Sequence, residues 1–534
     1  MATIIDTAAG PSVSAGLHRA IGWRHAFWVA AGVPALVLFS IGGIAATVGS
    51  PSWLVWMLSV TFGFIQSFTY AEIAGLFPNK SGGASVYGAA AWVRYSRIIA
   101  PLSVWCNWLA WTPVLAIGCG IAAGYILNAF FAPDALIRTW QLQLLDLGFL
   151  KEGLTLRINT TFIIGAVLML IVFAIQHRGI LGTARVQTII GVAVILPLLI
   201  IGIVPLLTGD VATTSFTPFA PGTDPATAAW NMDGWTLFLG GLFIAAWSAY
   251  AFETAICYTS EFKNPATDTY KAILYSGLLC IAVYTLVPFT FQGTLGVEGM
   301  LDPGIYDGTG VAAAMATIIG GGRFIYGLLV VMMLLALVLA IMTAMAGSSR
   351  TLYQGSVDGW LPRYLSHVNH NGAPTRAMWT DLSFNLILLL MSDYVFVLAV
   401  SNVCYIVFNF LNLNAGWIHR IDNGEVRRPW KAPSWLLGVG VVLSFVNAFL
   451  LGAGANVWGQ GTLLSGVIAI ALIIPVFLFR HYVQDKGEFP PQMLEDLRVD
   501  GKAALADGTR AGKLPYVTLA AGLAVVVIAN AIFW

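Results

Sequence analysis

The chain has 534 residues, of which 58% are hydrophobic and only 10% are charged, and its formal net charge is +1. Because about a quarter of the residues in soluble globular proteins are charged, this composition excludes that class and indicates a membrane protein with many spans. The net charge says little about partners, since the charges are divided between the two sides of the membrane. All five cysteines lie in apolar runs, so neither a disulfide framework nor a metal site is predicted.

Apolar runs organise the chain. A spanning helix needs about 20 residues, and thirteen runs are long enough to be candidates: residues 25–49, 53–77, 101–131, 159–176, 184–208, 236–258, 271–293, 323–349, 377–392, 394–417, 434–453, 461–480 and 515–533. The predicted fold is therefore all-α and polytopic, with about 12–13 transmembrane helices. The polar segment 1–24 and the charged segment 481–514 are expected in the cytoplasm. Residues 515–534 are either a further span or a helix along the interface.

The positive charges predict the orientation. If the N-terminus is cytoplasmic and the spans alternate, only Arg138, Lys151, Arg157 and Arg323 lie outside, and the other 22 of the 26 Lys and Arg lie inside. This distribution follows the positive-inside rule. It predicts a multi-pass protein of the plasma (inner) membrane with its N-terminus in the cytoplasm.

The sixth run contains an acid that needs an explanation. Glu253 lies inside an apolar stretch, where a charge near the bilayer centre costs at least a few kcal/mol, so that such residues are functional by default. The preceding segment, residues 247–252, combines small residues that let a ligand approach the backbone with aromatic residues that could close over it. A broken helix at a binding site is predicted. The alternative is a buried acid that pairs with a neighbouring helix.

The first run contains a second interruption. Pro34 follows Gly32 and cannot donate a hydrogen bond to the carbonyl of Ala30, so the helix is expected to loosen near residues 31–36. Interrupted first and sixth spans, entered from opposite sides, predict an inverted five-plus-five repeat with a transport site between them. The alternative here is a simple proline kink.

The repeat gives a domain prediction. Residues 25–208 form repeat 1 with helices 1–5, residues 236–420 form repeat 2 with helices 6–10, and residues 421–480 form two peripheral helices. No nucleotide-binding GxxxxGK[ST] motif or catalytic constellation occurs in the sequence. Neither an enzyme nor a cofactor is expected, and nucleic acid is not expected as a partner.

Four motifs, in order along the chain, carry a family resemblance. They are residues 70–78 with 81–83 and Tyr87; residues 247–253 followed by Glu261 and 263–265; residues 349–353 with 358–362; and residues 372–375. With these motifs the sequence resembles the amino acid/polyamine/organocation (APC) superfamily of secondary transporters over nearly its whole length. The resemblance implies a leucine-transporter-type fold with discontinuous helices 1 and 6, unwound at residues 31–37 and at about residues 247–251.

The resemblance also implies a site. The substrate-binding residues that it assigns are Ala31, Gly32, Val33, Pro34, Ala35 and Leu36 in span 1, Trp111 and Leu115 in span 3, and Trp247, Ser248, Tyr250 and Ala251 in span 6. Trp247 and Glu253 match gating positions. Independently of the family, the ends of half-helices attract the carboxylate and the ammonium group of an amino acid. Trp111 could instead belong to a packing stripe with Trp105 and Trp108. Glu72, near the loop that carries Arg94 and Arg97, is expected to be a structural anchor.

Two departures from the family pattern leave details open. Residues 35–37 read Ala-Leu-Val where relatives have a glycine-rich run, so an amine without an α-carboxylate remains an alternative substrate. Val194 stands about where some proton-coupled relatives carry a lysine. A sodium site would need hydroxyls such as those of Thr343, Ser348 and Ser349, although hydroxyls in membrane helices more often bond their own backbone. The coupling ion is therefore left open between H+ and Na+.

The sequence thus predicts a secondary permease in the lipid bilayer that moves an amino acid by alternating access, by symport or antiport. The first alternative is a permease for a polyamine or another organic amine. The second is a membrane sensor or channel-like protein with the same fold. The sequence leaves the oligomeric state open.

Overall fold

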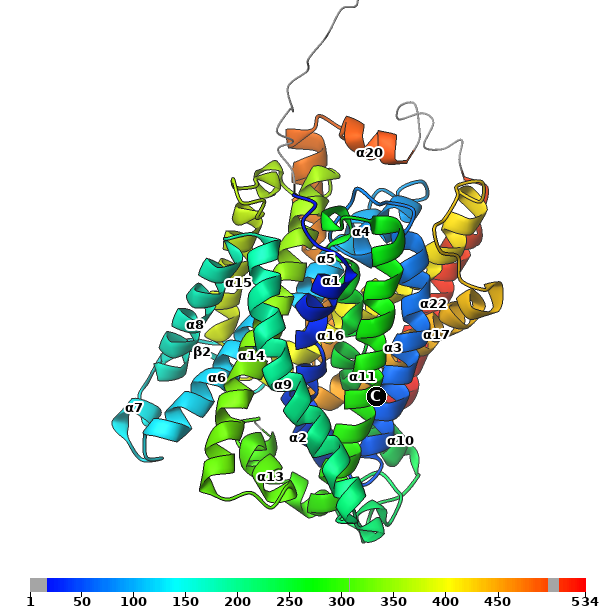
Figure 1. The fold of residues 1–534 in the computed structure, drawn as a ribbon. Coiled ribbons are helices and arrows are strands. Elements are labelled where there is room, and N and C mark those ends of the chain that lie inside the picture. The colour runs from blue at the N-terminus through cyan, green and yellow to red at the C-terminus, as the bar shows by residue number, and fades with distance from the viewer. Residues whose placement is uncertain (1–16, 307, 498–508) are drawn as a thin grey trace, which may run out of the picture.

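The computed structural model describes residues 17–306, 308–497 and 509–534. These residues form a bundle of long helices (Figure 1). The first half contains α1 (Trp23–Val29), 3₁₀ turns at Ala30–Gly32 and Pro34–Leu36, α2 (Val37–Val48), α3 (Ser52–Ala74), α4 (Ala84–Trp92), α5 (Ile99–Trp111), α6 (Pro113–Phe130), α7 (Leu136–Thr139), β1 (Gln141–Asp146), β2 (Thr155–Asn159), α8 (Thr160–Gln176), α9 (Ile180–Thr208) and a 3₁₀ turn at Thr213–Phe216.

The second half begins with α10 (Met232–Ala249), which is followed by 3₁₀ segments at Ala251–Ile256 and Thr259–Glu261. Then come α11 (Pro265–Met300), α12 (Pro303–Tyr306), α13 (Val311–Ile318), α14 (Arg323–Val357), a 3₁₀ turn at Arg363–Ser366, α15 (Thr375–Leu389), α16 (Tyr394–Asp422), α17 (Ser434–Gly454), a 3₁₀ turn at Ala455–Trp458, α18 (Thr462–Ala471), α19 (Ile473–Leu478), a π-helical turn at Phe479–Gln484, α20 (Pro491–Asp496) and α22 (Leu514–Phe533).

The helices agree with the predicted spans. Among the described residues, eleven helical segments are long and apolar enough to cross a membrane. The runs at 159–176 and 377–392 form the shorter helices α8, with 17 residues, and α15, with 15. The polytopic helical fold is confirmed, whereas the repeat boundaries stay a prediction.

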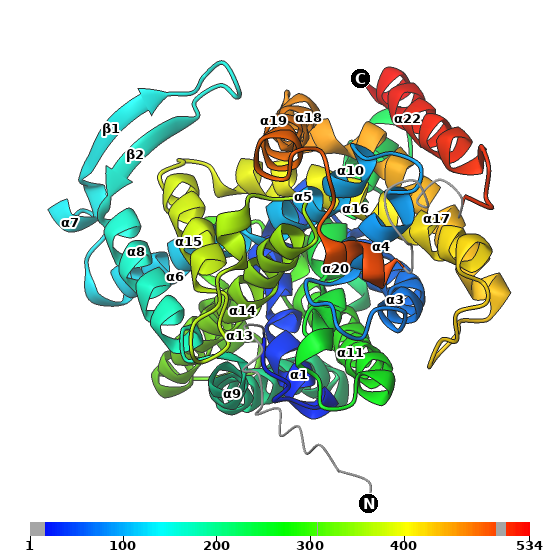
Figure 2. The same cartoon turned by 90° about the horizontal axis from the view of Figure 1, so that it is seen from above.

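A hairpin of two strands departs from an all-α chain. β1 and β2 pair antiparallel, with Gln141 opposite Asn159, and lie at the periphery beside α7 and α8 (Figure 2). Residues 155–159 alternate polar and apolar side chains, which suits a two-sided strand. On the other side of the bundle, α22 packs against α17, where Gly452 leaves room for the backbone of Val526.

The first and sixth spans lie in the interior. In the most apolar window of the first, 94% of the residues are buried, and in the sixth 78% are buried. The first span tightens at the expected place instead of unwinding. Pro34 cannot bond the carbonyl of Ala30, and the amide of Val33 bonds that carbonyl at 3.0 Å, which makes a 3₁₀ turn.

The sixth span changes geometry later than the residues 247–251 that the sequence suggested. Its α-helix continues through Trp247 and Ser248 to Ala249, because the amide of Tyr250 still bonds the carbonyl of Ala246 at 3.1 Å. The irregular part runs from Tyr250 to Glu261. Glu253 therefore lies in the middle of the irregular part.

Candidate functional site

The six residues predicted in span 1 are buried in the bundle, and Gly32 packs against α14. A Cβ atom on Gly32 would lie 2.4 Å from Oγ1 of Thr343 and 2.6 Å from the carbonyl oxygen of Leu339. The glycine is thus needed for close packing of two helices. Ala31, Val33, Pro34, Ala35 and Leu36 are also buried.

A tyrosine of α11 joins the two interrupted spans. The hydroxyl of Tyr284 lies 2.8 Å from the carbonyl oxygen of Val33 and 3.1 Å from that of Ser248. Backbone carbonyls on membrane helices need partners, because no water is available in the lipid to satisfy them. This shared hydroxyl brings the predicted segments of spans 1 and 6 together.

Trp247 is enclosed between α5 and α16. Its indole N–H lies within hydrogen-bonding distance of the carbonyl oxygen of Ala110, at 3.1 Å, and of the hydroxyl of Ser401, at 3.0 Å. Its ring is tilted against that of Phe39, with 6.4 Å between the ring centroids. Only 3% of Trp247 is exposed, so this arrangement is closed around the predicted gate.

Glu253 is fully buried and meets one of the predicted residues of span 3. The indole N–H of Trp111 donates to Oε1 of Glu253 at 3.0 Å. The other oxygen, Oε2, has no hydrogen-bond partner in the described part of the chain. It faces Gly83, since a Cβ atom on that glycine would lie 3.5 Å from it. The acid therefore presents one oxygen without a donor to the loop that carries the Ser81–Gly83 motif.

Three further predicted residues are Tyr250, Leu115 and Ala251. The hydroxyl of Tyr250 donates to Asn447 of α17 at 3.0 Å, towards the periphery of the bundle. Leu115 is buried on α6, separated from Trp111 by the helix boundary at Pro113. Ala251 opens the 3₁₀ segment that contains Glu253.

The three hydroxyls considered for sodium do not converge. Ser348 donates to Asp381 at 2.5 Å, and Ser349 turns back to the carbonyl of Ala346 in its own helix at 3.4 Å. Thr343 bonds the carbonyl of Val29 at 2.6 Å, but the amide nitrogen of Gln187 lies 3.1 Å from each of these two oxygens. A hydrogen-bond donor from α9 thus bridges the oxygen pair that a cation would use.

Sequence reasoning missed Gln187 and Asp381. Gln187 lies seven residues, about two helical turns, before Val194, on the same face of α9, so the signal was one polar residue on the face already considered. Asp381 is fully buried on α15. Its signal was the one that drew attention to Glu253, an ionisable residue within an apolar run.

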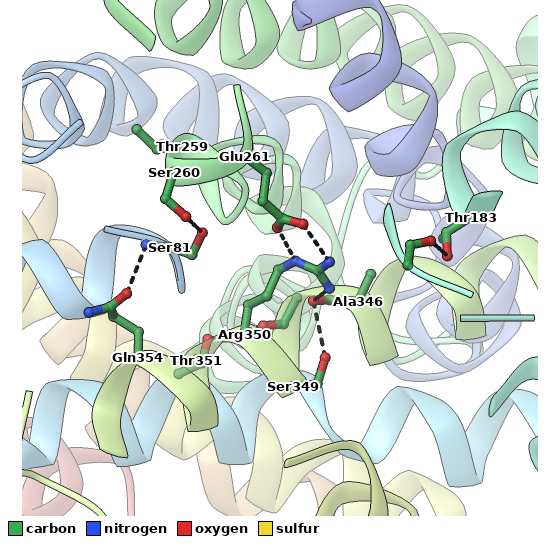
Figure 3. Close-up of polar contacts among 12 residues, drawn as sticks. Ser81, Thr183, Thr259, Ser260, Glu261, Ala346, Ser349, Arg350, Thr351 and Gln354 are labelled. Atoms are coloured by element: carbon green, nitrogen blue, oxygen red, sulfur yellow. Dashed lines mark hydrogen bonds and ion pairs between the residues drawn. The ribbon is translucent and has the colours of Figure 1, made fainter. Parts of the chain in front are cut away.

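Three of the family motifs meet in a buried polar cluster, shown in Figure 3. Glu261, at the end of the sixth span, pairs through both oxygens with Arg350 of α14, whose guanidinium also donates to the carbonyl of Ala346 at 2.9 Å. Beside this pair, the hydroxyls of Ser81 and Ser260 are 2.5 Å apart. The cluster fastens the end of span 6 to α14 and to the loop before α4.

Glu72 is an anchor, as expected, but through other arginines. Its oxygens pair with Arg420 at 2.6 Å and Arg428 at 3.1 Å rather than with Arg94 or Arg97. The amide of Ala432 adds a hydrogen bond at 2.8 Å. Glu72 therefore fixes α3 to the end of α16 and to the segment between α16 and α17.

Comparison with known proteins identifies the family of this chain. Residues 21–478 match the family described as amino acid permease. The branched-chain amino acid permease BcaP of Lactococcus lactis subsp. cremoris is 23% identical over 82% of this chain and 90% of its own length. The polyamine transporter PUT1 of Oryza sativa subsp. japonica is 24% identical over 84% and 74%. The L-methionine/branched-chain amino acid exporter YjeH of Escherichia coli is 28% identical over 50% and 54%.

The family match covers most of the chain and includes all four motifs quoted for the resemblance, which is thereby confirmed. Members of this family are transporters, and the many membrane-length helices make this chain a multi-pass membrane protein. The chain belongs to the amino acid permease family.

Proposed function

We propose that this protein is a secondary permease that carries an amino acid across the membrane by alternating access, with its site between spans 1 and 6 beside Trp247 and Glu253. The observation that carries the proposal is the carboxylate of Glu253. It is fully buried, lies in the irregular part of span 6, and has one oxygen without a hydrogen-bond donor among the described residues. An ammonium group supplies such a donor together with the missing positive charge.

Two helix ends would receive the charged groups of the substrate. α10 ends at Ala249, and the C-terminal end of a helix is the negative end of its dipole, which favours an ammonium group. α2 begins at Val37, and the N-terminal end of a helix favours a carboxylate. Trp247 lies in the last turn of α10, where it would cover the bound substrate. Because these residues are buried, the substrate can enter only if the helices move.

A specific observation supports the alternative substrate, an amine without a carboxylate. The space beside Gly32 is filled by Thr343 and Leu339 of α14, and residues 35–37 carry side chains where relatives have a glycine-rich run. Less bare backbone is then open to a carboxylate, whereas Glu253 remains as a countercharge for an amine. The polyamine transporter among the relatives fits this alternative.

The charge distribution supports a cytoplasmic N-terminus, since 22 of the 26 Lys and Arg would lie on that side. We assign the protein to the plasma (inner) membrane on the same basis. The pair Glu261–Arg350 would then lie towards the cytoplasm and hold that side closed in this arrangement.

Counterflow in proteoliposomes tests the function. Vesicles loaded with unlabelled leucine, isoleucine, valine or methionine should take up the same labelled amino acid, and neutral amino acids should compete. Competition by putrescine-like diamines alone would favour the amine permease. Specific ligand binding without saturable flux would contradict both and favour a sensor with this fold. Uptake that never saturates would indicate a channel.

A further inference from the structure

Asp381 is a second buried acid, and neutral donors surround it. Its Oδ1 accepts from the indole N–H of Trp108 at 2.8 Å and from the hydroxyl of Thr112 at 2.6 Å, and its Oδ2 accepts from Ser348 at 2.5 Å. The side chain is fully buried. Donors from span 3 and from α14 thus converge on one carboxylate of α15.

No basic group pairs with this carboxylate in the described part of the chain. α15 packs against α6, α8, α14 and the turn Arg363–Ser366. Arg350 is bound to Glu261, and Arg363 to Asp485. The other ionisable side chains on these elements, on α5 and on α15 itself are Cys106, Cys119, Tyr125, Arg323, Tyr326, Tyr353, Tyr364 and Arg376. An isolated carboxylate charge is costly inside a membrane, and with Arg350 and Arg363 engaged elsewhere a proton is the partner that can neutralise Asp381.

Span 3 connects Asp381 to the proposed substrate site. Trp108 and Thr112 donate to Asp381, while Trp111, between them in sequence, donates to Glu253. The carbonyl of Ala110 accepts from Trp247. One helical turn of α5 therefore touches both acids and the gate.

This turn lies at a natural bend. Pro113 follows directly and cannot make the helical hydrogen bond to the carbonyl of Leu109, so α5 ends and α6 begins here. Asn385, one turn after Asp381, donates to Thr112 at 2.6 Å and accepts from the amide of Ala116 at 3.2 Å. The α15 side chains thus hold both sides of the bend.

A cavity approaches the same network. It has a volume of about 280 Å³, and Ala116, Gly120, Leu388 and Arg157 are among the residues that line it. Ala116 is the residue whose amide is bonded to Asn385, the neighbour of Thr112. A chain of hydrogen bonds through Asn385 and Thr112 thus joins the cavity wall at Ala116 to Asp381.

We propose that Asp381 takes up and releases the proton whose movement is coupled to substrate transport. The inference rests on the proposed permease function and adds the coupling ion and its site. On protonation the carboxyl gains an O–H bond at Oδ2 from a hydronium ion, which leaves as water, and Ser348 turns its own proton to the carbonyl of Met345 and becomes an acceptor. The protonated carboxyl accepts weaker hydrogen bonds from Trp108 and Thr112. The bend at Pro113 is then free to move, and its movement shifts Trp111 and the carbonyl of Ala110, which accepts from Trp247. Release of the proton to water restores the original hydrogen bonds.

The test uses the full chain in proteoliposomes and compares counterflow with uphill accumulation under an imposed pH gradient. Wild type should accumulate substrate with an inward proton gradient and without sodium. Asp381→Asn should lose the accumulation at least tenfold, and its remaining counterflow should no longer depend on pH. Glu425→Gln is the control, since it removes an exposed carboxylate that pairs with Arg510 beyond the end of α16, and it should keep both activities.

Three results would overturn the inference. They are normal proton-driven accumulation by Asp381→Asn, accumulation by wild type that requires sodium, and wild-type exchange without accumulation under either gradient. Absence of wild-type counterflow would overturn the proposed function and this inference together. If Asp381→Asn does not fold, Asp381→Glu decides: a shifted pH optimum of accumulation supports the proton site, and an unchanged optimum contradicts it.

Discussion

Four buried acids among the described residues fall into two kinds. Glu72 and Glu261 pair with arginines and tie distant segments together, whereas Glu253 and Asp381 receive hydrogen bonds only from neutral donors in the described structure. A carboxylate held by arginine cannot exchange its partner without breaking an ion pair. A carboxylate among indole and hydroxyl groups can gain and lose a cation or proton without breaking an ion pair. The first kind should therefore govern folding and the second kind transport.

The largest expected effect is on the paired acids. Arg350→Ala would leave Glu261 as an uncompensated buried charge, which costs about 3–5 kcal/mol. The midpoint of thermal unfolding, followed by size-exclusion chromatography in detergent, should fall clearly below that of wild type. Arg363→Ala is the control, because 62% of that side chain is exposed and its pair with Asp485 is worth about 1 kcal/mol or less. Equal unfolding midpoints for the two variants would remove the distinction between the two kinds of acid.

Glu253→Gln tests the second kind of buried acid, which receives hydrogen bonds only from neutral donors. The amide oxygen can still accept from Trp111, so the unfolding midpoint should stay within a few degrees of wild type. A hydrogen bond to a charged group is worth about 1.5–3 kcal/mol, so loss of the charge should lower kcat/KM about 10- to 100-fold. Initial rates of counterflow across a substrate series give this ratio. A strongly destabilised variant would place Glu253 with the structural acids.

Substitutions of Trp247 test its role in covering the substrate, as distinct from the countercharge supplied by Glu253. Trp247→Phe keeps a ring but loses the N–H that contacts Ala110 and Ser401, and one neutral hydrogen bond of about 1 kcal/mol corresponds to a KM raised about fivefold. Trp247→Ala should raise KM further and speed substrate release, because nothing then covers the site. Ser401→Ala is the control, since the carbonyl of Ala110 remains as an acceptor. If Trp247→Ala and Glu253→Gln both transport at the wild-type rate, the assigned site is wrong.

The sequence was sufficient for the family and for most of the spans, because hydropathy acts locally, and Pro34 marked the place where the first span changes geometry. The sequence was insufficient for contacts between segments that lie far apart in the chain. The contact of Trp111 with Glu253 and the bridge of Gln187 between Val29 and Thr343 join residues more than 140 positions apart. Asp381 differs, since the argument applied to Glu253 holds for any acid in an apolar run. The α-helical state of Trp247 followed from no local signal, because its neighbours suit both helix and turn.

The smallest expected effect concerns a neutral link between the two interrupted spans. Tyr284→Phe keeps the buried ring but leaves the carbonyls of Val33 and Ser248 without the hydroxyl that joins them. Loss of a typical hydrogen bond costs about 0.5–1.5 kcal/mol, so the unfolding midpoint should fall slightly. Because the link holds spans 1 and 6 together in this closed arrangement, KM should also change, by about two- to threefold. Tyr516→Phe loses a hydroxyl contact from the peripheral helix α22 to the carbonyl of Tyr95, so it should show a similar loss of stability with KM unchanged. An equal change in KM for both variants would mean that the Tyr284 hydroxyl stabilises the fold as a whole. The movement of spans 1 and 6 would then depend on Glu253 and Asp381 and not on this neutral link.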